Sequence, residues 1–402
     1  MDLFLQMGHG MMGHAKELIK KWHAGTVILS PRDMTLFQME KFSKEIKKSG
    51  GEVLIDPQFY IPRADHEKLI NHPFWPNEFE TNTFFSGDGL RGMIQTLWND
   101  YNNRVGAKYF LLPGIFSSVI NDDWKALNDI FIEEGIKISP GVPSLATLCL
   151  SSDILRSEDQ IHEIIDHVES WNVIGFYVVP QHPDNSYLVE DPVWLANLLD
   201  LCAGLKNMNK KVIVGYSNHQ LLCLAAAKID AMASGTWVNV RMFPLSKFSK
   251  PDDDSFIKGT TWYYCPQALS EYQIRFLDVA KNVGILNKLR TDSSFHSEYA
   301  DILFLGAQPT SVKFSEREAF RHYLQCLKIH TTQTARGSFS ETLNGLFMQL
   351  EAASQLLKLF RAKGVRGSYR DFSEVLDINI SALDQFKAAR GFMFGKKWDN
   401  IN

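Results

Sequence analysis

The chain of 402 residues is poor in cysteine, and its five cysteines lie far apart, with no CxC or CxxC pair. An odd number of scattered cysteines argues against a disulfide framework and against a cysteine-rich zinc site. No run approaches the roughly 18 apolar residues of a membrane span, and the first residues, MDLFLQMGHG, place no basic region before an apolar one. The sequence therefore predicts no membrane partner, no secretory signal and a cytoplasmic location.

An excess of charge of one sign is also missing, because 42 Lys and Arg residues against 46 Asp and Glu residues give a formal net charge of −4. This balance gives no global attraction to nucleic acid, so any phosphate-binding surface must be a local patch. With 45% apolar and 12% aromatic residues, the chain can bury one large core, or one core with an appended module. The composition predicts a soluble globular protein.

The sequence is rich in short apolar runs that alternate with amphipathic stretches, the pattern of βα units in a parallel sheet. Typical helical stretches lie at 36–50, 123–135 and 191–207. Eight such units in about 240 residues predict one (β/α)₈ barrel, a TIM-like fold, over residues 1–238. The predicted strands are Leu3–Met7, Thr26–Ser30, Glu52–Asp56, Lys108–Pro113, Ser144–Leu150, Val173–Pro180, Lys211–Ser217 and Ile229–Ser234.

Beyond Ser234 the alternation stops, and a charged loop at 247–256 is followed by long helical stretches. Two of these are SEYQIRFLDVAKNVGILNKL and ETLNGLFMQLEAASQLLKLFRAK. Residues 239–402 are therefore predicted to form a helical C-terminal extension packed on the barrel. Its basic run at 361–370 is interpreted as an ordinary solvated helix end, with a phosphate-binding patch as the alternative.

Asp56 ends the apolar run GEVLI and opens the stretch DPQFY. In a parallel barrel, functional groups stand at the carboxyl ends of the strands. A carboxylate at that position, followed by a proline turn and two aromatic residues, is placed to act as an acid or a base. Asp56 is therefore the predicted catalytic residue. Asp33 also follows a predicted strand, but it lies just before a helix and is interpreted as a cap of that helix.

Other polar and aromatic residues follow the predicted strands and are candidates for a site at the same mouth. For each of them the alternative is a residue that caps the next helix or packs in the core. The candidates are His9, Gln58, Phe59, Tyr60, Gln181, Tyr216, Asn218, Ser234 and Trp237. Several histidines near one mouth raise a metal-hydrolase hypothesis, but the usual HxH pair on the first strand is missing around His9, so no metal site is predicted.

The segment VGYSNHQLLCLAAAKIDAMASGTW, at 214–237, resembles part of the tRNA-guanine transglycosylase superfamily, which includes enzymes that insert 7-deazaguanines into DNA. There the family has a pattern like GxGxPEDLLxAVxxGVDMFDC across its seventh strand, the following helix and its eighth strand. The matching positions in this chain are Gly215, Leu221, Leu222, Ala226 and Asp230.

Two further stretches carry the same resemblance. DPQFY is similar to the family's DSGGF at the end of the third strand, with the family's aspartate falling on Asp56. The stretch at 263–281 is similar to the segment that follows the family's zinc cysteines. The resemblance follows most of the chain in the order of its elements, and it implies a barrel that acts on a nucleic-acid base.

The sequence departs from the family at three positions. The family's nucleophilic aspartate falls on Ala233, its zinc-binding CxC cysteines have no counterpart, and its guanine-reading aspartate falls near Pro113 and Gly114. The resemblance therefore implies a relative with a changed pocket, without structural zinc and without a cofactor.

The chemistry implied by these departures is hydrolysis. Base exchange by a retaining route needs a nucleophile that holds the sugar covalently, and Ala233 cannot do so. A lone carboxylate can still deprotonate a water molecule and stabilise an oxocarbenium-like sugar. The resemblance thus implies a glycosylase that cleaves the N-glycosidic bond of a modified, flipped base, with Asp56 as general base. Because both missing features serve the tRNA enzymes, DNA is the expected partner, and relatives in phage defence imply an antiphage role.

In this hypothesis the aromatic candidates stack on the base and the polar candidates bond to its edge. Three cations just past the eighth strand are expected to contact the flanking phosphates. They are Arg241, Lys247 and Lys250.

Two alternatives stay open at the level of sequence. One is base exchange on DNA or tRNA with another residue as nucleophile. The other is a catalytically silent subunit that only binds nucleic acid. Association with further copies as a homo-oligomer is left open as well.

Overall fold

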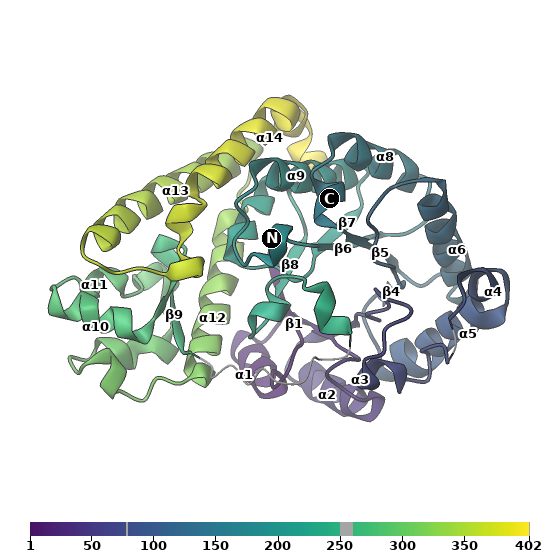
Figure 1. Ribbon diagram of the computed structural model, residues 1–402, viewed down its shortest axis with the longest axis horizontal. Coiled ribbons are helices and arrows are strands. Elements are labelled where there is room, and N and C mark those ends of the chain that lie inside the picture. The colour runs from purple at the N-terminus through teal and green to yellow at the C-terminus, as the bar shows by residue number, and fades with distance from the viewer. Residues whose placement is uncertain (78, 250–259, 402) are drawn as a thin grey trace.

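The computed structural model describes residues 1–77, 79–249 and 260–401, and its core is one nearly closed sheet of eight parallel strands (Figure 1). The order around the sheet is β3-β2-β1-β8-β7-β6-β5-β4. The strands are β1 (Asp2–Gln6), β2 (Thr26–Leu29), β3 (Glu52–Ile55), β4 (Phe110–Leu111), β5 (Ser144–Leu150), β6 (Gly175–Pro180), β7 (Lys211–Val214) and β8 (Ala231–Ser234). A hydrogen bond of 2.9 Å from Lys108 N to Val53 O joins the two edges. The predicted (β/α)₈ barrel is confirmed.

The strands read as continuous apolar runs because both of their faces are covered, one by the barrel interior and one by helices. All seven residues of β5 are buried, and β5 has the predicted bounds although Pro143 precedes it. The register places Leu5 of β1 beside Val27 of β2 and beside Ser234 of β8. The carboxyl ends of the strands consequently meet at one mouth.

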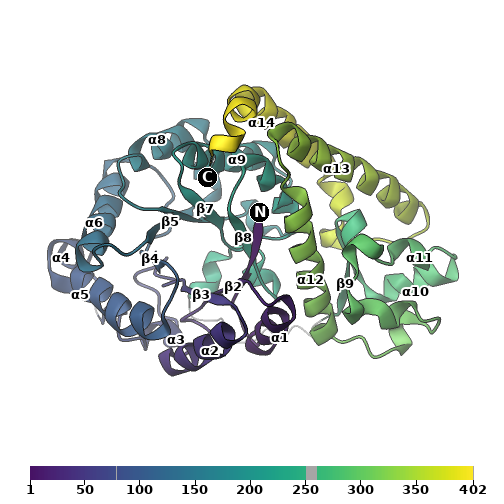
Figure 2. The same ribbon diagram turned by 180° about the vertical axis from the view of Figure 1, so that it is seen from behind.

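Helices surround the sheet on its outer face (Figure 2). They include α1 (Met12–Trp22), α2 (Leu36–Lys48), α6 (Asp122–Ile138), α8 (Glu158–Val168) and α9 (Pro192–Asn207). The long connection from β3 to β4 holds α3 (Glu67–Ile70), α4 (Thr81–Ser86), α5 (Asp88–Thr96) and η1 (Leu97–Asn103), and the short one from β7 to β8 holds η3 (His219–Ala227).

The cap of α2 differs from the expectation. Thr35 and Gln38 form a capping box, in which the Thr35 hydroxyl accepts from Gln38 N at 3.3 Å and the Gln38 side chain accepts from Thr35 N at 2.8 Å. The interpretation of Asp33 as the cap of this helix is therefore wrong. Asp33 instead accepts a hydrogen bond from the Ser30 hydroxyl at 2.9 Å.

After β8 the chain crosses the barrel mouth before it enters the extension. We call residues 239–249 the mouth loop. From here on, the extension means the described residues that follow it, 260–401. The extension begins with an antiparallel hairpin, β9 (Trp262–Cys265) and β10 (Ser270–Gln273). The sequence predicted a helix from Ser270, and this is wrong because the first four residues of that stretch pair with β9 before α10 begins.

The extension continues with α10 (Ile274–Asn282), α11 (Leu286–Leu289), α12 (Glu316–Thr334), α13 (Phe339–Ala362) and α14 (Leu376–Lys397). Helix α12 lies between the barrel and the outer part of the extension (Figures 1 and 2). Helix α14 is held against α9 by Arg390, whose Nε lies 2.6 Å from Asp200. Among the described residues, no helix is both long and apolar enough to cross a membrane.

A buried cluster of charges joins the mouth loop to the extension. One oxygen of Glu271 on β10 accepts from Arg241 at 3.0 Å and from Arg370 at 2.8 Å, and the other accepts from the Tyr187 hydroxyl at 2.6 Å. Burial by itself raises the pKa of Glu271, but the charges of Arg370 and Arg241 outweigh it and hold the pKa at about 2. The Arg241 guanidinium also lies 3.5 Å from the ring centre of Tyr323 on α12.

Glu271→Gln removes the carboxylate that compensates two buried guanidinium groups. We expect the free energy of unfolding at neutral pH to fall by about 3–5 kcal/mol, as when one partner of a buried ion pair is removed. Urea denaturation measures it. Glu374→Gln, which breaks an exposed pair with Arg361, is the control and costs about 0–1 kcal/mol.

The loss of unfolding free energy caused by Glu271→Gln is also expected to depend on pH. Because the folded pKa of Glu271 lies below its ordinary value of 4.5, the wild type keeps this stabilisation above that value and loses it as the pH falls toward 2. The advantage of the wild type over Glu271→Gln therefore shrinks in acid. Equal costs for Glu271→Gln and the control would contradict the assignment.

Candidate functional site

Asp56 follows β3 at the mouth of the barrel and is 1% exposed. Both of its oxygens lie 2.8 Å from the Tyr60 hydroxyl. Oδ1 accepts from Gln58 N at 3.0 Å, and Oδ2 accepts from the Tyr216 hydroxyl at 3.2 Å. The Tyr177 hydroxyl of β6 lies 3.5 Å from Oδ2 and donates to Gln6 at 2.9 Å. Three tyrosines from separate parts of the chain thus surround one carboxyl group.

This environment moves Asp56 toward neutrality. Burial raises the pKa of Asp56 to about 6, although hydrogen bonds from Tyr60, Gln58 and Tyr216 act in the opposite direction. Burial also raises the pKa of the tyrosines well above the ordinary value, so they stay protonated and remain donors. A carboxyl group that titrates near pH 6 suits general acid–base chemistry at neutral pH.

The backbone on both sides of the site is in the left-handed region. Gln58 has a φ of 56° and Tyr216 a φ of 52°. Residues other than glycine seldom adopt this conformation, which costs of order 1 kcal/mol or more and is found preferentially at functional sites. The two side chains meet, because Gln58 Nε2 donates to the Tyr216 hydroxyl at 3.2 Å. The strained residues are therefore those that orient the donors around Asp56.

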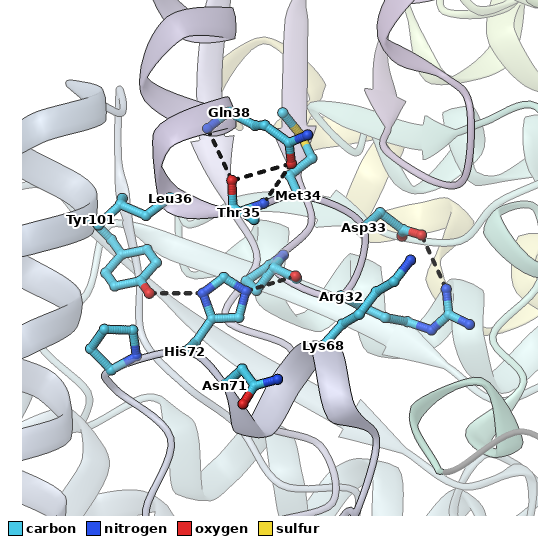
Figure 3. A pocket seen from close by; sticks show the side chains of 12 residues that line it. Arg32, Asp33, Met34, Thr35, Leu36, Gln38, Lys68, Asn71, His72 and Tyr101 are labelled. Atoms are coloured by element: carbon cyan, nitrogen blue, oxygen red, sulfur yellow. Dashed lines mark hydrogen bonds and ion pairs between the residues drawn. The ribbon is translucent and has the colours of Figure 1, made fainter.

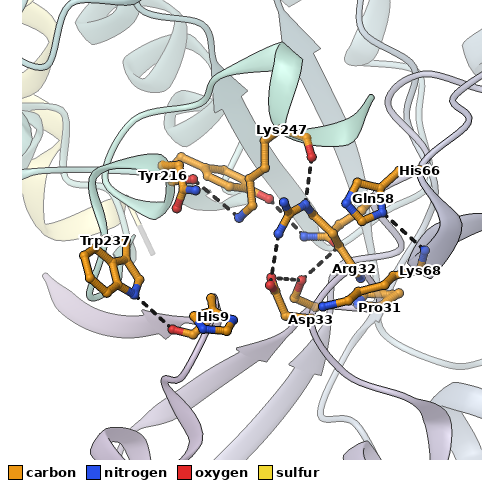
Figure 4. Close-up of polar contacts among 12 residues, drawn as sticks. His9, Pro31, Arg32, Asp33, Gln58, His66, Lys68, Tyr216, Trp237 and Lys247 are labelled. Carbon is orange, nitrogen blue, oxygen red and sulfur yellow. Dashed lines mark hydrogen bonds and ion pairs between the residues drawn. The ribbon is translucent and has the colours of Figure 1, made fainter. Parts of the chain in front are cut away.

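A chain of polar contacts leads from this site to the rim of the mouth (Figure 4). Gln58 Oε1 accepts from Arg32 N and from the Ser30 hydroxyl, both at 3.0 Å. The same hydroxyl lies 2.9 Å from Asp33, and Asp33 pairs with the Arg32 guanidinium at 3.1 Å. Asp56 is thus connected to the rim through Tyr216, Gln58 and Ser30.

The mouth loop closes over Asp56. The ring of Phe243 lies 5.1 Å from that of Tyr60 and 5.2 Å from that of Tyr216, and the ring of Phe248 lies 5.1 Å from that of Tyr60. Arg32 Nε donates to the carbonyl of Lys247 at 2.7 Å, which ties the loop to the end of β2. Because Asp56 is buried and the mouth loop packs on two of its donors, we expect the loop to move before a substrate reaches Asp56.

The structure brings only some of the predicted site residues together. Gln58, Tyr60 and Tyr216 contact Asp56 or each other. Phe59 turns away from the mouth and packs against Trp75, with ring centres 5.1 Å apart. The Phe59 side chain therefore belongs to the core and not to the group around Asp56.

The remaining predicted residues are spread around the mouth. Gln181 accepts from Ser152 N at 3.2 Å, and Asn218 donates to a carbonyl at 2.6 Å and caps η3. Ser234 is buried, and its hydroxyl has no partner among the described residues. Trp237 Nε1 donates to the carbonyl of His9 at 3.1 Å, across the mouth from Arg32 (Figure 4).

Two of the three predicted phosphate-binding cations, Arg241 and Lys247, are buried. Arg241 is 2% exposed and is paired with Glu271, and Lys247 is 7% exposed with its ammonium 5.4 Å from the Tyr216 ring centre. Burial lowers the pKa of Lys247 to about 8. Lys250 lies outside the described residues. At the rim the cations are instead Arg32 and Lys68, which the sequence interpretation missed (Figure 4).

Sequence reasoning also missed Tyr177 and Ser30. Tyr177 is the one residue with a polar side chain in the strand GFYVVP, and that contrast was a usable signal. Ser30 ends a predicted strand, as Asp56 does, but a serine at a strand end is too common to be singled out. The Tyr177 hydroxyl lies between Asp56 and Gln6, and the Ser30 hydroxyl lies between Gln58 and Asp33.

A cavity of about 450 Å³ lies beside Asp33 (Figure 3). Its walls include Arg32, Asp33 and Lys68, and the ring of His72 is fixed there by Tyr101 and by the carbonyl of Pro31, each at 2.8 Å. Largely apolar walls with a few polar groups are typical of small-molecule pockets. In residues 1–77, 79–249 and 260–401, no three His, Cys, Asp or Glu side chains are grouped to hold a metal.

No protein-family model matches the chain, and no curated protein matches it. Among solved structures, native xylanase 10B from Thermotoga maritima aligns with 58% of this chain and 82% of its own, with 9% identity and a TM-score of 0.34. The 3-dehydroquinate dehydratase from Aquifex aeolicus VF5 aligns with 62% and 95%, with 11% identity and a TM-score of 0.31. Similarities this low carry no argument about function, and the resemblance to the transglycosylase superfamily stays a prediction.

Asp56→Asn tests the environment of the carboxyl group without any substrate. Because the folded pKa of about 6 lies above the ordinary 3.8, the unfolded chain loses its proton first, and the wild type is destabilised as the pH rises through this window. We expect Asp56→Asn to gain about 2 kcal/mol of unfolding free energy relative to the wild type between pH 4 and pH 7. Denaturation across that range measures it.

Asp384→Asn, at an exposed position of α14, is the control and is expected to change stability little at any pH. Parallel stability curves for the wild type and Asp56→Asn would show that Asp56 is not held in this environment.

Proposed function

We propose that the protein hydrolyses the N-glycosidic bond of a modified base in DNA, with Asp56 as the general base. The observation that carries the proposal is the buried carboxyl group of Asp56 at the mouth, whose pKa is raised to about 6 by burial. None of the groups that shift this pKa is another carboxylate. A retaining glycosidase uses two such groups close together, so the arrangement favours direct attack by water. Ala233 in β8 supplies no nucleophile.

In this mechanism the base is drawn from its stack into the mouth after the mouth loop moves. Ionised Asp56 takes a proton from a water molecule while the oxygen of that water attacks the anomeric carbon. The electron pair of the carbon–nitrogen bond leaves with the base, which takes a proton from solvent. Tyr60 and Tyr216 keep Asp56 oriented, and its negative charge stabilises the positive charge on the sugar. Phe243 and Phe248 exclude further water.

The cavity beside Asp33 supports a place for the flipped base. Its volume of about 450 Å³ is in the range of ligand pockets, and the polar chain from Asp56 ends at its wall. Arg32 and Lys68 stand at the rim, where flanking phosphates would pass. The preference for DNA and a role in phage defence rest on the sequence resemblance alone.

A different observation favours a second function, that of a catalytically silent subunit that binds nucleic acid. Both oxygens of Asp56 are already occupied by donors, and Phe243 and Phe248 pack on one of these donors, Tyr60. A carboxyl group in that state can serve the packing of the mouth alone. The two functions differ in whether the mouth opens.

Asp56→Asn removes the proton acceptor while keeping the size of the side chain. We expect the rate of base release to fall on the order of a hundredfold or more, as on loss of a general base. The measurement is release of free base from a panel of modified DNAs and tRNAs, followed by mass spectrometry.

The products separate the functions. Hydrolysis leaves an abasic site without any added free base and without a covalent adduct of the protein. A strict need for added free base would show exchange instead, and binding without release would show a silent subunit.

Tyr216→Phe tests how Asp56 is tuned. A general base must be ionised, so the wild-type rate rises with pH through about 6. Removing the Tyr216 donor raises the pKa of Asp56, and we expect the rising limb to move up by about one pH unit. The control is Tyr272→Phe, at a buried tyrosine of β10 that is not among the groups that shift the pKa of Asp56. Superimposable profiles for Tyr216→Phe and the wild type would exclude this tuning.

A further inference from the structure

A second cavity, of about 50 Å³, lies where the end of β8 meets the extension. Three of its walls are the buried Arg241, Glu271 and Arg370, and a fourth is Thr236, two residues past β8. The first turn of α12, at 316–320, forms a further part of the lining. The barrel and the extension therefore build this cavity jointly.

Two polar groups around this cavity have no partner among the residues that the structure describes. The Thr236 hydroxyl, on a residue that is 2% exposed, makes no hydrogen bond among the described residues, and neither does Nε of Arg370, which is 8% exposed. Native proteins seldom leave such groups unpaired, because the loss of water is then uncompensated. A donor guanidinium and a hydroxyl in one small cavity are what an oxyanion would bind.

The buried charged side chains around the cavity have a net positive charge, as binding of an anion requires. Arg241 and Arg370 carry two positive charges against the one negative charge of Glu271, to which both are bonded. The amino end of the 19-residue helix α12 adds partial positive charge. Among the described residues, Glu316 and Glu318 in the first turn of α12 oppose this charge. Of these two, Glu316 lines the cavity, but it is partly exposed, so solvent screens it more than the buried pair.

The size of the cavity selects among anions. At roughly 10–15 Å³ for each water position, the cavity holds a few water molecules, the space of one tetrahedral oxyanion. Guanidinium groups match phosphoryl oxygens with paired hydrogen bonds. Trp237 and Trp262 also line the cavity and offer aromatic faces beside it.

We propose that this cavity binds a phosphoryl group of a nucleic-acid strand at the junction of the barrel and the extension. The loops after the last strands of such barrels, with the amino end of an extra helix, are a frequent place for phosphate. The proposal does not rest on the hydrolysis proposed above, because it concerns binding at residues apart from Asp56.

Isothermal titration calorimetry tests the site with three probes: inorganic phosphate, an oligonucleotide with a 5′-phosphate and the same oligonucleotide without it. We expect inorganic phosphate to bind, and Thr236→Val to weaken it about tenfold by deleting one hydrogen bond to a charged group. Thr332→Val is the matched control and leaves the affinity unchanged, because this exposed threonine of α12 lies in the last turn of the helix, away from the end that lines the cavity. Tighter binding of the 5′-phosphorylated strand identifies a strand end as the source, and equal binding of both strands identifies an internal phosphate.

Two further variants test the phosphate site independently of Thr236→Val. Arg370→Lys keeps the charge but loses the paired donors, so it weakens phosphate binding even if Thr236→Val fails to fold. Glu316→Gln removes the opposing charge and is expected to tighten binding several-fold, whereas a site for a cation would respond in the opposite sense. Asp56→Asn leaves phosphate binding as it is. Failure of all three probes to bind, or binding that is insensitive to both Thr236→Val and Arg370→Lys, overturns the proposal.

Discussion

The burial of the Asp56 carboxyl group governs the geometry of the barrel mouth. Taking a charge out of water is costly unless donors replace the water, and here the replacements are tyrosine hydroxyls and a backbone N–H. To supply them, the chain adopts left-handed backbone at Gln58 and Tyr216. Replacement is incomplete, as the raised pKa of Asp56 shows. Stability lost at this point is typical of sites that are kept for chemistry.

The mouth loop links this carboxyl group to the rest of the molecule. One part of it is fixed by Arg241 to Glu271 of the extension, and another by its Lys247 carbonyl to Arg32 at the end of β2. The buried attachment is strong because breaking it leaves charges uncompensated, and the attachment at the rim is a single hydrogen bond. Movement of the loop should therefore start at the rim, beside the cavity next to Asp33.

The fold could be predicted from the sequence to a large extent because strands that are buried on both faces leave long apolar runs. The eight strands were found in this way, including β5 behind Pro143. The β9–β10 hairpin was missed because the stretch from Ser270 continues into a helix with the same apolar spacing. Whether residues 270–273 form a strand or a helix depends on their pairing with β9, and local sequence does not specify that pairing.

The site was predictable only in part, for a related reason. Asp56 and Tyr216 were found because they end strands, and strand ends meet at one mouth. Arg241 also follows a strand, but its role depends on Glu271, a residue of the extension that sequence spacing could not bring next to it. Phe59 was placed in the mouth, but its side chain packs against Trp75 in the core. Partners that are distant in sequence, and side-chain directions in loops, are what the sequence alone did not provide.

The pairing of β1 with β8 has a consequence for how the chain acquires its shape. Strand β1 is made first, yet one of its two neighbours consists of residues near position 231. During synthesis, one edge of β1 has no strand to pair with until β8 (Ala231–Ser234) has emerged. Pairings between such distant segments slow folding, and an unpaired apolar edge invites association with other chains. The nascent protein is therefore expected to need protection at β1 until β8 has been made.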